Sequence, residues 1–213
     1  MSDLNHIIES QQEMFSALAR AEKGELKIPD LKPFCGVFGV LIQRNDLLAV
    51  RVRIPGGELP VNKMKFLAEL AAKVNPGYIH FSSRHNIQMH DATPGAAAEI
   101  IRECTANGLP FRGGGGDSFR NISATISAGV ADDGSFDLIP YVQYLTDAIF
   151  DWDEAFQLPR KLKIAFASAN DSALALRQDL GFVATRDASG NPGFTVYGGG
   201  GFGRNAAVGL KLI

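Results

Sequence analysis

Arginines stand where two predicted strands end or bend, in RVRIPGG (residues 51–57) and in RHNIQMH (residues 84–90). Side chains two residues apart share a face of an extended strand, so Arg51 and Arg53 point one way and their apolar neighbours the other. The proline and glycines that follow end the strand, because proline lacks a ladder donor and glycine tolerates turn geometry. RVRIPGG therefore predicts a strand with one cationic face and one core face.

The same alternation recurs in KLKI, where Lys161 and Lys163 share one face of a predicted strand. Two ammonium groups on one face repel each other unless an anion lies between them. The net charge is only -2, so a local concentration of cations indicates a pocket for a compact anion. The alternative is that these are ordinary solvated surface charges.

Two glycine-rich tracts, residues 113–116 and 198–201, allow backbone to approach a bulky ligand and offer amide donors. Gly198, Gly200 and Gly203 formally satisfy GxGxxG, but no helix is predicted to open from them, so we do not expect a dinucleotide site. His80, His85 and His90 fit no common zinc spacing. We expect structural histidines; the minority alternative is a histidine that donates to a ligand carboxylate.

Composition excludes several classes of protein. Cys35 and Cys104 provide neither a disulfide framework nor a metal knuckle, so we expect buried thiols and no metal site. The near-neutral charge argues against a nucleic-acid binder. No run approaches the ~18 apolar residues of a membrane span, and the N-terminus lacks the order of a signal peptide. We therefore expect a cytoplasmic protein without a membrane partner.

Periodicity predicts an α+β chain. We expect an amphipathic helix over residues 3–21, an extended connector over 27–35, and a hairpin of strands 36–43 and 47–54. A helix from Pro60 to Asn75 and strands 78–82 and 86–90 follow, and then a helix that Thr93 caps and Gly108 ends. This order is typical of a ferredoxin-like layer.

The sequence becomes glycine-rich directly after Arg112, at residues 113–116, and we expect a second α+β unit from there on. Its predicted elements are helix 139–150, strand 161–168, helix 172–180 and the hairpin of strands 182–185 and 194–197. The chain stops on an apolar, strand-like run whose partners we expect to be missing, which predicts a truncated chain. The expected divisions are an arm (1–34), a ferredoxin-like half-domain (35–111) and an incomplete α+β domain (112–213).

Five motifs in fixed order, RVRIPGG, SSRHNIQMH, FRNIS, LPRKLK and YGGGG, resemble the N-terminal half of siroheme-dependent nitrite and sulfite reductases. The resemblance implies a ferredoxin-like half-domain followed by a siroheme-binding domain. It also implies six-electron reduction of sulfite to sulfide or of nitrite to ammonia, at a siroheme coupled to a 4Fe-4S cluster. ATISAGV, after FRNIS, lacks the cysteine or proline common there in relatives.

Carried over by motif position, the resemblance implies four basic residues around the substrate anion: Arg53, Arg120, Lys161 and Lys163. It implies siroheme contacts for Arg84, Arg51, Gln88, His90, Asn121, Gly199 and Gly200. Siroheme is a polycarboxylate and its substrate an oxyanion, so both need fixed cations, and ammonium groups can deliver protons. We predict that these cations converge on one cavity.

The implied partners are sulfite or nitrite, an electron donor (ferredoxin or a flavoprotein) and a C-terminal half of the same protein. The family's cluster cysteines lie in that half, and Cys35 and Cys104 lack cluster spacing, so this chain alone is expected to be inactive. The alternative of a different class is a non-catalytic tetrapyrrole- or anion-binding module, or an assembly subunit.

Overall fold

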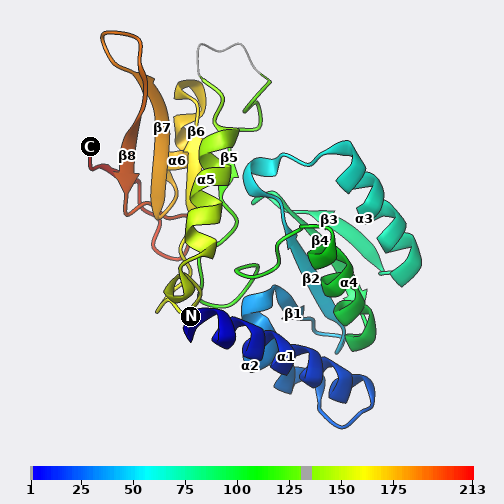
Figure 1. The fold of residues 1–213 in the computed structure, drawn as a ribbon. Coiled ribbons are helices and arrows are strands. Elements are labelled where there is room, and N and C mark those ends of the chain that lie inside the picture. The colour runs from blue at the N-terminus through cyan, green and yellow to red at the C-terminus, as the bar shows by residue number, and fades with distance from the viewer. Residues whose placement is uncertain (1, 131–135) are drawn as a thin grey trace. The chain divides into compact units, whose positions relative to one another are not determined.

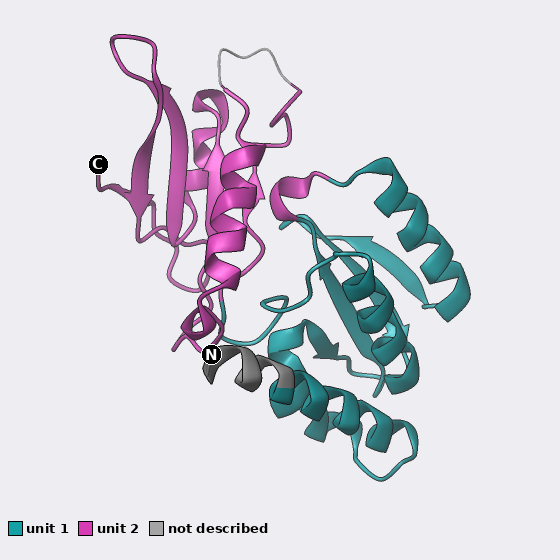
Figure 2. Cartoon of the chain, viewed as in Figure 1, with its two compact units in different colours: residues 1–54, 59–118 teal, residues 55–58, 119–213 magenta. Residues whose placement is uncertain are grey.

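The computed structural model describes residues 2–130 and 136–213 (Figure 1). The chain forms two compact units (Figure 2). Unit 1 comprises Met1–Ile54 and Leu59–Ser118, and unit 2 comprises Pro55–Glu58 and Phe119–Ile213. Both units combine helices with a β-sheet, which confirms the α+β class.

Unit 1 is built on an antiparallel sheet whose strands lie in the order β1-β2-β4-β3. The strands are β1 (Val40–Ile42), β2 (Leu48–Arg53), β3 (Tyr78–Phe81) and β4 (Asn86–Ala92). The helices are α1 (Ser2–Glu22), α2 (Lys32–Cys35), α3 (Val61–Val74) and α4 (Pro94–Ala106), and the 3-10 turns are η1 (Ile28–Leu31) and η2 (Gly36–Phe38).

One face of this sheet carries the apolar core. Val50 and Val52 of β2 pair with Met89 and Ile87 of β4, and all four belong to the buried cluster that also includes Ile100 of α4. The residues that alternate with these four along β2 and β4 therefore point to the opposite face of the sheet.

Local signals at the start of α4 act as the sequence predicts. The Thr93 side chain accepts a hydrogen bond from the Ala96 N–H (3.2 Å), and Pro94 occupies the first turn, where a missing N–H is harmless. The Glu22 carboxylate of α1 accepts a second bond from the Gly95 N–H (2.7 Å). A carboxylate at a helix N-terminus also favours the helix dipole.

The predicted extended connector over residues 27–35 is wrong. The segment forms η1 and α2, with a proline in the first turn of each. Proline has the φ angle of a helix and needs no N–H partner there, so Pro29 and Pro33 begin the turns instead of preventing them. The turns bury Leu31 and Cys35 in the core.

Unit 2 contains a mixed sheet in the order β5-β6-β7-β8-β9. Its strands are β5 (Ser123–Ala124), β6 (Ile164–Ala167), β7 (Leu180–Arg186), β8 (Pro192–Gly198) and β9 (Leu210–Lys211). Its helices are α5 (Ile139–Phe150) and α6 (Ser172–Leu176), and its 3-10 turns are η3 (Pro55–Gly57), η4 (Asp153–Phe156) and η5 (Ala169–Asp171). The predicted helix 139–150 and the β7–β8 hairpin are confirmed.

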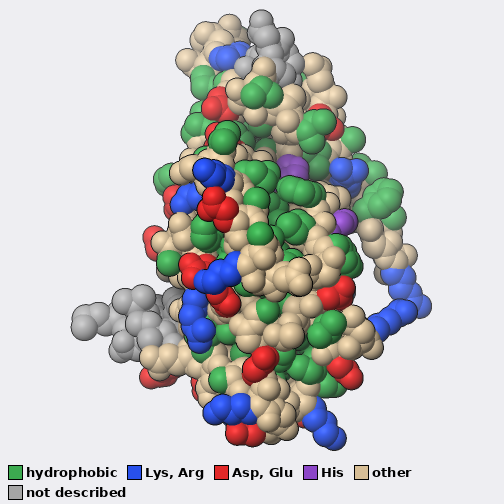
Figure 3. Space-filling view, turned by 90° about the vertical axis from the view of Figure 1, so that its right-hand side faces the viewer, with side chains coloured by type: hydrophobic (Ala, Val, Ile, Leu, Met, Phe, Trp, Pro, Cys, Tyr) green, Lys and Arg blue, Asp and Glu red, His purple; other side chains and the backbone are tan. Residues whose placement is uncertain are grey.

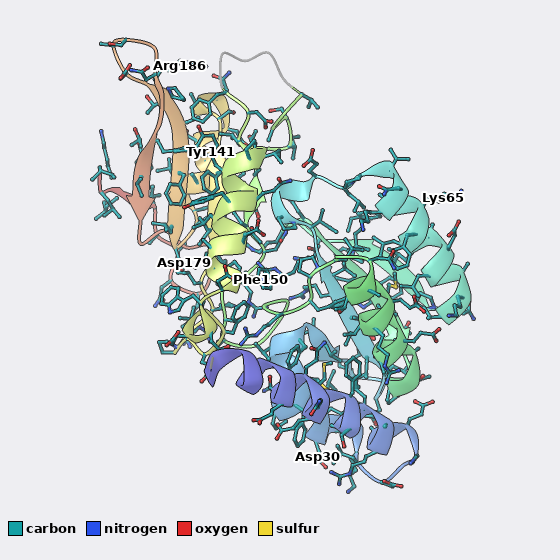
Figure 4. The ribbon with its side chains drawn as sticks, in the orientation of Figure 1. Asp30, Lys65, Tyr141, Phe150, Asp179 and Arg186 are labelled. Carbon is teal, nitrogen blue, oxygen red and sulfur yellow. The ribbon has the colours of Figure 1, made fainter. Side chains whose placement is uncertain are left out.

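Aromatic side chains pack against one another in unit 2. Phe166 of β6 stacks on Phe182 of β7, with ring centroids 4.6 Å apart, and Phe194 of β8 meets Phe166 edge to face. Phe150, labelled in Figure 4, lies at the end of α5. Its ring packs against that of Phe119, with ring centroids 5.9 Å apart. Such geometries are the preferred ones for ring pairs, so this packing fixes how β6 sits beside its neighbours.

Two predicted boundaries in unit 2 are wrong, and so is the expectation that the terminal strand lacks a partner. Strand β6 begins at Ile164, and helix α6 ends at Leu176, because Leu180 is already paired with Ile164 in the sheet. The terminal apolar run does not lack a partner: β9 pairs antiparallel with β8, and the Leu212 N–H donates to the Val196 carbonyl (2.8 Å).

Candidate functional site

The polar face of the unit 1 sheet gathers several of the predicted site residues. Arg51 lies directly opposite Gln88, and Arg53 directly opposite Asn86, across β2 and β4. Arg53 is fully buried (0% exposed) and Gln88 nearly so (7%). The predicted division of β2 into a cationic and an apolar face is confirmed, since Val52 between the arginines is in the core.

Both arginines donate hydrogen bonds to backbone carbonyls of residues 112–114. The Arg51 Nη1 donates to the Gly114 carbonyl (2.7 Å), and the Arg53 Nη1 donates to the Arg112 carbonyl (2.7 Å). Burial lowers the pKa of Arg51 from its ordinary value, although an arginine remains charged in proteins. These bonds fix where the remaining guanidinium donors point.

The glycines at 113–116 have a different role from the one their sequence suggested. The Gly113 N–H donates to the Val37 carbonyl (2.7 Å), and the Gly114 N–H donates to the Phe111 carbonyl (2.9 Å). A β-carbon on Gly115 would lie 2.3 Å from the Gly36 carbonyl oxygen. The prediction of amide donors for a ligand is wrong for Gly113 and Gly114, whose N–H groups bond the chain itself, because this tract packs backbone against backbone.

Arg84 lies in the tight bend between β3 and β4. The Asn86 side chain donates to the Arg84 carbonyl (3.2 Å), and the Asn86 N–H donates to Ser82 Oγ (3.1 Å). His85 has φ 53°, a left-handed conformation that a sharp reversal requires. The bend is thereby held by Asn86, which also faces Arg53.

His80, His90 and Tyr78 lie together on the same polar face. The His90 ring stacks on Tyr78, with centroids 4.3 Å apart and an interplanar angle of 11°, and His80 meets it edge-on at 6.1 Å. The predicted placement of His80 and His90 on one side of paired strands is confirmed. Figure 3 shows histidine side chains at the surface among hydrophobic and charged ones.

In unit 2, parallel pairing brings the other predicted cations together. Phe119 forms a parallel bridge with Leu162, and the Arg120 N–H donates to the Leu162 carbonyl (2.8 Å). Arg120 is thus held beside the residue between Lys161 and Lys163, which precede β6. The adjacent Asn121 is buried (1% exposed).

Asp179 links Lys163 to the second glycine tract. Its Oδ2 accepts from the Lys163 N–H (2.8 Å), and its carbonyl accepts from the Gly199 N–H (3.0 Å). Figure 4 shows Asp179 at the start of β7. A β-carbon on Gly200 would lie 2.3 Å from the Leu176 carbonyl oxygen, so only glycine fits there.

The predicted site residues thus form two groups, one in each unit. Unit 1 holds Arg51, Arg53, Arg84, Gln88 and His90, and unit 2 holds Arg120, Asn121, Lys161, Lys163, Gly199 and Gly200. That both groups line one cavity stays a prediction. Two further residues, Asp179 and Gln43, were not predicted. Their contacts depend on pairing between distant segments, so local patterns carry no sign of them.

Within residues 2–130 and 136–213, no group of three or more His, Cys, Asp or Glu side chains is placed to hold a metal ion. None of the helices in that part of the chain has the length and apolar content that a membrane crossing requires.

The fold defines an α+β protein with a ferredoxin-like sheet unit and a second unit on a mixed sheet. Residues 41–107 match the nitrite/sulfite reductase ferredoxin-like half domain, and residues 115–213 match the nitrite and sulphite reductase 4Fe-4S domain. The chain therefore belongs to the siroheme-dependent nitrite and sulfite reductase family, as its motifs suggested.

Among curated relatives, ferredoxin–nitrite reductase of Leptolyngbya laminosa is 29% identical over 92% of this chain and 39% of that protein. Ferredoxin sulfite reductase of Mycobacterium tuberculosis is 26% identical over 76% of the chain and 29% of its own length. The chain thus matches well under half the length of these relatives. The Mycobacterium tuberculosis NirA structure matches 95% of the chain and 42% of its own chain at a TM-score of 0.77 and 20% identity, a likeness of fold.

Proposed function

We propose that this chain is the siroheme- and substrate-binding part of a nitrite or sulfite reductase. The observation that carries the proposal is the pairing in unit 2, where the Arg120 N–H bonds the carbonyl of the residue between Lys161 and Lys163. Three cations at neighbouring backbone positions form a natural site for a small oxyanion, since such charges repel unless an anion lies among them. Nitrite and sulfite both meet that requirement.

The polar face of unit 1 fits a carboxylate-bearing macrocycle. Arg51 Nε and His90 Nε2 are buried side-chain donors with no hydrogen-bond partner in the described chain. Such groups cost free energy unless a ligand satisfies them. Siroheme carboxylates would be held by Arg51 and Arg84, with Gln88 and His90 as further donors.

When bound, siroheme would supply the electron transfer to the substrate. The chain's own residues would hold the oxyanion and stabilise its charge through Arg53, Arg120, Lys161 and Lys163. A lysine ammonium would also give up a proton as each substrate oxygen leaves as water. In this proposal, nitrite becomes ammonia, or sulfite becomes sulfide, by uptake of six electrons from a ferredoxin or flavoprotein donor.

The residues of this chain do not fit a 4Fe-4S cluster. Cys35 and Cys104 lie outside residues 115–213, the stretch that matches the 4Fe-4S domain, and both are buried in the unit 1 core. Burial raises the pKa of each thiol to about 12, whereas a cluster is held by thiolates. We propose that the cluster is supplied by a C-terminal half, and that this chain alone is inactive.

The same absence of cysteine from residues 115–213 favours a second candidate, a tetrapyrrole- or anion-binding module without catalysis. The deciding experiment is an absorption spectrum of the purified full-length protein, followed by nitrite and sulfite reduction with a chemical electron donor. Siroheme bands with turnover support the reductase. Siroheme bands without turnover support the module. A protein that takes up no siroheme when reconstituted contradicts both the reductase and a tetrapyrrole-binding module.

A further inference from the structure

Gln43, which follows β1, contacts two consecutive residues of β4. Its Oε1 accepts from the Asp91 N–H (2.8 Å), and its Nε2 lies 3.3 Å from His90 Nδ1. A backbone N–H can only donate, so the Gln43 oxygen must face Asp91 and the amide NH₂ must face His90. The orientation of the amide is therefore settled by the backbone of β4.

That orientation determines which ring nitrogen of His90 carries the proton. An amide NH₂ can only donate, so His90 Nδ1 must accept and cannot be protonated. A neutral imidazole has one N–H, which is then on Nε2. His90 Nε2 is buried and has no hydrogen-bond partner in the described chain. The sheet thus presents an oriented N–H that lacks an acceptor.

The surroundings of His90 hold the ring in place and favour its neutral form. Tyr78 of β3 stacks on the ring. Burial, then the neighbouring His80 of β3 and Arg51 of β2, lower the pKa of His90, while Asp91 of β4 acts in the opposite direction. Protonation would also place an Nδ1–H against the Gln43 NH₂, which further disfavours the imidazolium.

We propose that Gln43 is a positioning residue that holds His90 in the Nε2–H form, and that this N–H donates to a carboxylate of a bound tetrapyrrole. The ligand class rests on the proposed function. The tautomer rests only on contacts within unit 1, so the two parts are tested separately.

The tautomer is tested by nitrogen NMR of His90 in the ligand-free chain. Wild type is expected to show the Nε2–H form above its pKa. In Gln43→Glu, one carboxylate oxygen still accepts from Asp91 and the other accepts from Nδ1–H, so the pKa of His90 rises. Asn45→Asp places a carboxylate on the same turn, where the Asn45 side chain bonds Asp91 (3.1 Å), and should raise the pKa less. An Nδ1–H form in wild type, or a pKa unchanged in Gln43→Glu, overturns this part.

The ligand is tested by fluorescence titration with uroporphyrin, an iron-free tetrapyrrole rich in carboxylates. His90→Phe keeps an aromatic ring against Tyr78 but removes the N–H, and should weaken binding by about three- to tenfold. Gln43→Met should also weaken uroporphyrin binding, but by less than His90→Phe does. Equal binding by wild type and His90→Phe overturns the carboxylate contact alone. Failure of the folded wild type to bind overturns it together with the proposed function, while the NMR result stands.

Discussion

Gly39 and Gly114 pack backbone against backbone. A β-carbon on Gly114 would lie 2.8 Å from the Gly39 Cα and 3.1 Å from the Arg51 carbonyl oxygen, and neither atom belongs to a flexible side chain. The same Gly114 carbonyl accepts from the Arg51 guanidinium. Close packing of Gly114 on Gly39 therefore fixes the position of the Gly114 carbonyl, which orients the Arg51 side chain of β2.

Gly114→Ala is expected to lower the free energy of unfolding by about 1–3 kcal/mol, because the backbone must shift to admit the methyl group. Gly36→Ala is the matched control, since Gly36 belongs to the same unit, has no positive φ, and has open space around its β-carbon position. Denaturant unfolding of both variants provides the measurement. Equal free energies of unfolding for Gly114→Ala and Gly36→Ala would show that the backbone contact between Gly114 and Gly39 is not tight.

Asp179→Ala should lower the free energy of unfolding by about 1 kcal/mol, because the Lys163 N–H loses its acceptor. Asp179→Asn retains a side-chain oxygen and should recover most of that loss. Asp30, labelled in Figure 4, is exposed in η1, and Asp30→Ala serves as the control. If Asp179→Asn is as unstable as Asp179→Ala, the hydrogen bond is not what Asp179 contributes.

Much of the fold follows from short-range patterns. The Thr93 cap with Pro94 gives α4 its start, and alternation around Arg51 gives β2 its two faces. The prolines at 29 and 33 led to the wrong prediction of an extended segment, because proline is compatible both with extended chain and with the first turn of a helix. Only the burial of Leu31 and Cys35 selects the turn.

The site was less predictable than the fold. Motif order predicts which cations form the site, but the partners of those cations lie far away in sequence. Gln43 contacts His90 through pairing of β1, β2 and β4, and Asp179 reaches Lys163 through pairing of β6 with β7. Such contacts depend on strand register, which the local pattern does not specify.

Both thiols are expected to be unreactive in the folded chain. Burial raises the pKa of Cys35 and Cys104 from an ordinary 9.0 to about 12, so each thiol ionises far more readily in the unfolded chain. The contribution of the two buried, neutral thiols to the free energy of unfolding is therefore fully present below pH 9 and is lost as the pH rises toward 12.

Between about pH 8 and about pH 10, each thiol should reduce the free energy of unfolding by about 1 kcal/mol. Denaturant unfolding over this range provides the measurement, and a Cys35→Ala, Cys104→Ala double variant is the control because other groups titrate there too. The same pH slope in the double variant would contradict the prediction. Rapid modification of the native thiols by a thiol reagent would contradict it as well.

Lys163→Ala in the full-length protein should reduce turnover by about a hundredfold while leaving siroheme content nearly unchanged, because a charge aimed at the reacting anion acts mainly in the transition state. The backbone of Lys163 should stay in place, since its N–H bonds Asp179 and its carbonyl accepts from Leu180 (3.1 Å). Lys65→Ala, on the exposed part of α3, removes the same charge elsewhere and should change neither quantity (Figure 4). Turnover is followed with a chemical electron donor and siroheme by its absorption bands. Near-normal turnover in Lys163→Ala would remove Lys163 from the active site, and parallel losses of siroheme and turnover would make it a cofactor-binding residue instead.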